Sequence, residues 1–112
     1  MTEGVRIRDI ENEKARRRAA RRMVGEYHEQ QLRLLLDHVG DGFVRLDAGE
    51  IDPFDLDDLI HQCKRAAQEL CSFCGSGGGA WERAALLLEW EREQGEPETD
   101  WWEAGRSRRR DD

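Results

Sequence analysis

Apolar residues recur at steps of mostly three, four or five along residues 20–46, which is the spacing of one helix face. This apolar seam consists of Ala20, Val24, Tyr27, Leu32, Leu35, Val39, Phe43 and Leu46. Gly25, Gly40 and Gly42 interrupt it, and each glycine costs about 1 kcal/mol in a helix interior. The apolar residues keep their helical spacing across these glycines. The pattern therefore predicts a long helix and leaves open a break at 40–42.

The segment after this seam carries the signals of a helix end, a short turn and a helix start. Gly49 suits the position after a helix, where a positive φ is needed. Asp52 is a good N-cap, and Pro53 follows it at the first helical position. Asp55 places an acid in the positive first turn. We therefore expect a second helix to begin at Pro53.

The second helix is predicted to run to about Cys74, because its apolar positions keep the helical period. Its predicted apolar face is Leu56, Leu59, Ile60, Cys63, Ala66, Ala67, Leu70, Cys71 and Cys74. Two successive helices of similar length joined by a short turn favour an antiparallel helical hairpin.

A glycine-rich linker at 75–79 and a shorter helix at 80–94 complete the predicted fold. In the short helix, Trp81, Ala85, Leu88 and Leu87 are expected to face inward. The fold class is therefore all-α: a long antiparallel hairpin with a short third or fourth helix packed on it. Residues 1–24 are interpreted as a basic helical arm continuous with the first helix, 25–95 as the bundle domain, and 96–112 as an irregular polar tail.

Basic and acidic residues are unevenly distributed along the chain, whose net charge is −7. Residues 1–24 carry eight bases against four acids, and the rest carries ten bases against 21 acids. Such asymmetry indicates a binding partner. The arm's arginines could neutralise phosphates, so one hypothesis is a nucleic-acid accessory protein. Its candidate contacts are Arg16, Arg17, Arg18, Arg21 and Arg22, while the acidic body argues against a duplex.

The composition bears on compartment and stability. The first 24 residues lack the apolar stretch of a secretory signal, and the longest apolar run is far shorter than a membrane span. Three cysteines make a poor disulfide framework, so a cytoplasmic location is expected. Sixteen arginines against two lysines are typical of a GC-rich bacterial genome. Leu, Ile, Val and Phe number only 22, which predicts a thin core that a partner or a homodimer would reinforce.

Metal binding is a third hypothesis. His61, Cys63, Cys71 and Cys74 are ligand types of a zinc site. On one helix, however, Cys63 and Cys71 stand about 12 Å apart along the axis, too far to share an ion. Cys71 and Cys74 form a CxxC that closes a helix instead of opening one, which disfavours redox chemistry. The cysteines are better interpreted as small buried residues.

No catalytic constellation, phosphate loop or calcium loop meets its residue pattern in this sequence. We therefore expect no enzyme, no cofactor and no resident metal. The first hypothesis is a protein that binds another protein, as a regulatory, adaptor or antitoxin-like accessory subunit. Trp90, Trp101 and Trp102 are its candidate contacts, because tryptophan is a favoured interface anchor. At least one tail indole is expected to dock within the chain, on the groove beside the short helix.

Overall fold

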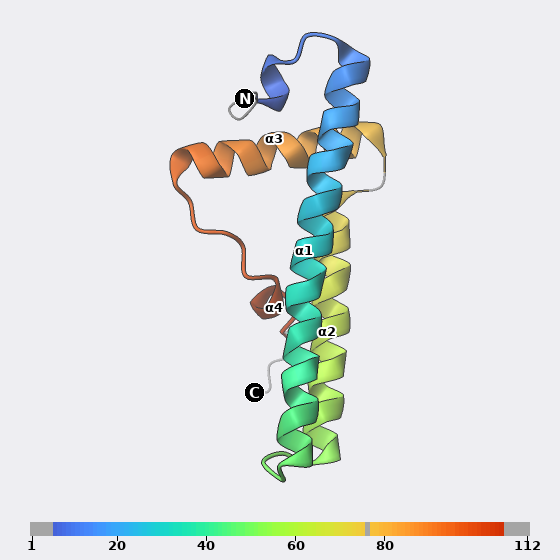
Figure 1. Cartoon of the computed structure of the whole chain (residues 1–112), viewed down its shortest axis with the longest axis vertical. Helices are drawn as coiled ribbons and strands as arrows, with labels where there is room; N and C mark the ends of the chain where they lie inside the picture. The colour runs from blue at the N-terminus through green and yellow to red at the C-terminus, as the bar shows by residue number, and fades with distance from the viewer. Residues whose placement is uncertain (1–5, 76, 107–112) are drawn as a thin grey trace. The chain divides into compact units, whose positions relative to one another are not determined.

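The computed structural model describes residues 6–75 and 77–106. The described residues form helices and contain no strand: η1 (Ile7–Asp9), α1 (Glu13–Asp47), α2 (Pro53–Cys74), α3 (Gly78–Gln94) and α4 (Trp101–Ala104) (Figure 1). The all-α class is confirmed, with the long helix α1 packing against both α2 and α3. The final bases of the tail, Arg108, Arg109 and Arg110, lie outside the described residues.

The helix boundaries agree with most of the local signals. Helix α2 begins at Pro53 and ends at Cys74 as predicted. Helix α3 begins two residues earlier than expected and ends before Gly95, whose φ of 72° is left-handed. The tail, expected to be irregular, contains the single helical turn α4. In the described part of the chain, no helix is both long and apolar enough to cross a membrane.

The turn between α1 and α2 is fixed by a reciprocal pair of hydrogen bonds. The Asp55 amide donates to Asp52 Oδ1 at 2.8 Å, and the Asp52 amide donates to Asp55 Oδ2 at 3.1 Å. Gly49 has a φ of 77°, a left-handed conformation that favours glycine. The predicted helix stop and helix start are therefore both present.

Helix α1 continues through residues 40–42 without a break. A Cβ atom at Gly42 would lie 2.8 Å from Leu56 Cδ1 and 2.9 Å from Leu59 Cδ1. The missing side chain at this position therefore lets α2 approach α1 closely. The destabilising effect of glycine on an isolated helix is offset here by packing between helices.

The chain divides into two compact units, each described by itself. The first unit comprises Met1–Glu29 with Cys71–Thr99, and the second comprises Gln30–Leu70 with Asp100–Asp112. Among described residues, the first unit buries Ile7, Ala20, Val24, Tyr27, Cys74, Ala84, Ala85 and Leu88. The apolar residues buried in the second unit are Leu35, Leu56, Cys63, Ala66 and Leu70. Both cores are small, as the composition predicts.

Four positions assigned to apolar faces are exposed. Phe43 is 50% exposed, Ile60 is 43% exposed and Leu87 is 42% exposed, and Cys71 also lies at the surface. The seams are wider than the strip that one neighbouring helix covers, so their edges stay in contact with water. The helical period was correct, but it could not give the width of the covered strip.

Replacing Leu70 tests the core of the hairpin. Leu70 is fully buried, so Leu70→Ala should lower the free energy of unfolding by about 2–5 kcal/mol. Phe54 is 81% exposed, and Phe54→Ala should change the free energy of unfolding by no more than about 0.5 kcal/mol. Denaturant melts measure both variants, and equal small losses would contradict the assigned core.

Candidate protein-binding surfaces

The C-terminal segment docks onto the hairpin of the second unit (Figure 1). The Trp102 ring stacks on His38 of α1, with centroids 4.0 Å apart and planes 6° from parallel. Gln62 Nε2 donates to the Trp102 carbonyl at 2.9 Å, and Arg65 Nε donates to the Gly105 carbonyl at 2.7 Å. Both helices of the hairpin therefore hold this segment.

Two short-range features shape the docked segment. Asp100 caps α4 by accepting a hydrogen bond from the Glu103 amide at 3.2 Å. Gly105 lies so close to α2 that a Cβ would stand 2.5 Å from the Ala66 amide nitrogen and 2.7 Å from its Cα. Backbone contact at this distance requires glycine.

Docking of a tail tryptophan within the chain is therefore confirmed, but its expected place was wrong. The contact expected was with the groove beside the short helix, whereas the contact found is a stack of Trp102 on a histidine of α1 in the hairpin. The stack with His38 and the glycine contact at Ala66 are long-range, so the spacing along the sequence gave no sign of them. Trp101 is half-buried in the same unit. A role for either indole in binding a partner stays a prediction.

Trp90 belongs to the first unit and is available at the surface. Trp90 is 49% exposed on α3, and Leu87, one turn earlier, is 42% exposed. Residues three apart lie on one helix face, so the two side chains form a small apolar surface.

Most exposed large apolar side chains lie on the hairpin of the second unit. Among the described residues there are eight such side chains, and the second unit has six: Leu34, Leu36, Phe43, Val44, Phe54 and Ile60. We call Leu36, Phe43 and Ile60 the flank surface. Val44 and Phe54, which we call the tip pair, lie near the α1–α2 turn on the outer sides of α1 and α2, since each stands about 180° around its helix from a residue of the α1–α2 contact, Leu35 and Cys63. Clustered exposed apolar residues mark binding sites more often than single ones do.

Sequence reasoning did not select these surfaces as candidates. It placed Phe43 and Ile60 in the core and gave binding roles to tryptophans. The signal present in the sequence was the breadth of the apolar seam, which exceeds what one neighbouring helix can cover.

Several arginines of the proposed arm have partners within the first unit. Arg16 Nε contacts Glu82 Oε2 at 2.6 Å, and its Nη1 donates to the Ile10 carbonyl at 2.8 Å. The guanidinium carbon of Arg21 lies 5.0 Å above the Trp81 ring, a cation–π arrangement.

Arg17 forms an exposed ion pair with Glu13 at 2.8 Å, as the four-residue spacing suggests. Arg18 and Arg22 are exposed and make no ion pair or hydrogen bond with the residues described. The five arginines therefore do not form one free basic surface.

Acids of α3 hold the chain before α1. Glu93 pairs with Arg6 at 3.0 Å and with Arg8 at 3.1 Å, and Glu89 accepts a hydrogen bond from the Ile7 amide. The carboxylates of Glu93 and Asp9 raise the pKa of Arg6. Part of the positive charge of residues 1–24 is thus neutralised inside the first unit.

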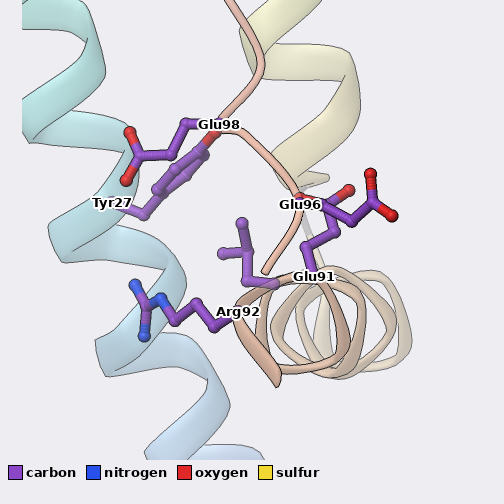
Figure 2. A pocket seen from close by; sticks show the side chains of 6 residues that line it. Tyr27, Glu91, Arg92, Glu96 and Glu98 are labelled. Carbon is purple, nitrogen blue, oxygen red and sulfur yellow. The ribbon is translucent and has the colours of Figure 1, made fainter. Parts of the chain in front are cut away.

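A shallow hollow in the first unit has an acidic rim. Tyr27 and Leu88 line it together with Glu91, Glu96, Glu98 and Arg92 (Figure 2). Its volume is about 300 Å³, which includes open solvent. The three carboxylates could attract a cation, but nothing bound or buried within the hollow points to a particular ligand.

The cysteines differ in exposure and in acidity. Cys63 and Cys74 are buried, and burial raises the pKa of both thiols, that of Cys74 to about 11, with a smaller contribution from Cys71. Cys71 is exposed, which corrects the expectation that all three are buried. Among the described residues, no group of three or more His, Cys, Asp or Glu side chains is placed to hold a metal ion.

Comparisons with protein-family models, curated proteins and solved structures find no match to this chain. Inference about function therefore depends on the surfaces described above.

The docked tail predicts the effect of adding one methyl group. Gly105→Ala should displace the tail from Ala66, expose Trp102 and shift tryptophan emission to longer wavelength. The matched control is Gly40→Ala, because a Cβ at Gly40 meets open space and alanine favours the helix by about 1 kcal/mol. An emission spectrum of Gly105→Ala identical to that of the parent protein would contradict the docking.

Thiol reactivity should separate the cysteines. The thiolate is the reactive form, and the buried Cys63 and Cys74 combine poor access with a raised pKa. Alkylation of the folded protein at neutral pH should therefore modify Cys71 first, and all three cysteines should react once the chain is unfolded. Peptide mass spectrometry identifies the modified residue, and early labelling of Cys74 would contradict this order.

Proposed function

We propose that this protein is a non-catalytic helical module that binds another protein through the hairpin of the second unit. A regulatory, adaptor or antitoxin-like accessory subunit acts in this way. The observation that carries the proposal is the position of six of the eight exposed large apolar side chains on this hairpin.

The physical argument begins with the cost of exposure. Each square ångström of apolar surface removed from water contributes about 25 cal/mol, so a complementary surface gains from covering these side chains. Phe54 is 81% exposed and Val44 is 67% exposed, which leaves the tip pair open to a partner. The docked tail holds α1 and α2 from one side, so the hairpin presents a preorganised surface.

Charge supports a protein partner with a basic rim. The chain carries a net charge of −7, and Asp47, Glu50, Asp52 and Asp55 surround the turn near the tip pair. A partner that encloses this end of the hairpin, with apolar surface against each helix and Lys or Arg near the turn, would complement it in charge.

A second candidate function is nucleic-acid binding by the arm, favoured by the exposed Arg18 and Arg22 beside Arg17. Arg16 and Arg21 are engaged with Glu82 and Trp81, which removes two of its five candidate contacts. A weak, salt-sensitive association is the most that the remaining arginines support.

The tip pair provides the test. The double variant Val44→Ser/Phe54→Ser should abolish capture of the partner by the tagged protein from its native host. The matched control Arg18→Gln/Arg22→Gln should leave capture intact, and nuclease treatment should not release the partner. If the arginine variant alone loses its partner, and nuclease releases it, the nucleic-acid function replaces the proposal.

A further inference from the structure

The flank surface is an uncovered apolar strip that lies opposite the docked tail. At 100° per residue, Leu36 and Phe43 point within about 20° of each other on α1. His38, which contacts the tail, lies on the opposite side of the plane that contains the axes of α1 and α2. On α2, Ile60 falls on the Leu36 side, whereas Ala66 contacts Gly105.

The composition of residues 107–112 does not suit them to cover this strip. Residues 107–112 read Ser-Arg-Arg-Arg-Asp-Asp and contain no apolar side chain. Yet Leu36 is 55% exposed, Phe43 is 50% exposed and Ile60 is 43% exposed. Among the described residues, the second unit therefore has one flank of its hairpin covered by its own tail and the other flank uncovered.

The flank has a two-fold pattern along the helix axis. The midpoint between Leu36 and Phe43 along α1 falls between Val39 and Gly40. Each of the two residues lies 3.5 positions, about 5 Å along the helix axis, from this midpoint. Ile60 of α2 lies at the same height along the hairpin as this midpoint of α1. The correspondence follows from two contacts, because Cys63 Sγ lies 3.8 Å from the Leu35 carbonyl and Gly42 packs between Leu56 and Leu59.

Charges at the edge of the flank follow the same pattern. Asp57 and Lys64 are both exposed and lie on the Ile60 side of α2, on either side of Ile60. An axis through this level, perpendicular to the helices, places Asp57 of one chain opposite Lys64 of a second chain, and the reverse. Asp57 Oδ2 also lies 3.5 Å from His61 Nδ1 on its own helix.

We infer that the flank surface binds a second copy of this chain. Two hairpins pack face to face, α1 against α1 and α2 against α2, each pair antiparallel, into a four-helix bundle. Leu36 of each chain packs beside Phe43 of the other, and the two Ile60 side chains meet at the axis.

The length of the hairpin limits how far this contact can extend. Residues 30–47 and 53–70 each extend over about 27 Å of helix, along which the two hairpins can pack. The inference deepens the proposed binding function and rests on it, because it names the partner of one surface and leaves the tip pair for the other partner.

The test is the dimer dissociation constant of the full chain, measured by analytical ultracentrifugation. Asp57→Lys alone places a lysine opposite Lys64 in both symmetry-related contacts. The repulsion should raise the dimer dissociation constant roughly tenfold. The double variant Asp57→Lys/Lys64→Asp restores opposite charges and should restore the dimer. Asp58→Lys, a neighbouring exposed acid that points away from the flank, is the matched control and should leave the dimer intact.

Two further variants probe the apolar contact. Phe43→Glu should yield a folded monomer at every concentration, whereas Val44→Glu, its exposed neighbour outside the flank, should stay dimeric. Circular dichroism verifies that each variant is folded. A parent protein that is monomeric at all concentrations, or a charge exchange that fails to restore the dimer, overturns the inference.

Capture by the tip pair separates this result from the proposed function. If the chain is monomeric and still captures its partner through Val44 and Phe54, the dimer is wrong and the binding function stands. If both measurements are negative, both proposals fail.

Discussion

The close approach of α1 and α2 around Gly42 is the constraint on which the second unit depends. Leu56 and Leu59 occupy the space that a side chain at position 42 would fill. At this register of α2 against α1, Cys63 Sγ lies 3.8 Å from the Leu35 carbonyl. The same register places His38, Gln62 and Arg65 around the tail. It also determines which apolar residues remain uncovered.

Local signals predicted the elements of this fold well. The capping pair Asp52 and Asp55 and the left-handed Gly49 are properties of a few adjacent residues, so the sequence identified them directly. The continuity of α1 through residues 40–42 could not be predicted in this way. It depends on a helix that is distant along the chain, and propensity alone would disfavour it.

The candidate sites were harder to predict than the helices, for two physical reasons. Whether Phe43 or Ile60 is buried depends on how much of a seam the neighbouring helix covers, and periodicity gives only the direction of the seam. The availability of an arginine depends on distant acids, as Glu82 of α3 shows for Arg16. Charge sorting along the sequence thus overstated the basic character of the arm, because its neutralising carboxylates come from α3.

In the described part of the second unit, the tail covers one flank of the hairpin and leaves the other flank open. Isotope-filtered NMR on a mixture of labelled and unlabelled chains examines the open flank most directly. The account predicts intermolecular NOEs between the Leu36 methyl groups of one chain and the Phe43 ring of the other. A spectrum in which both side chains show only contacts within their own chain, with the relaxation rates of a monomer, would contradict it.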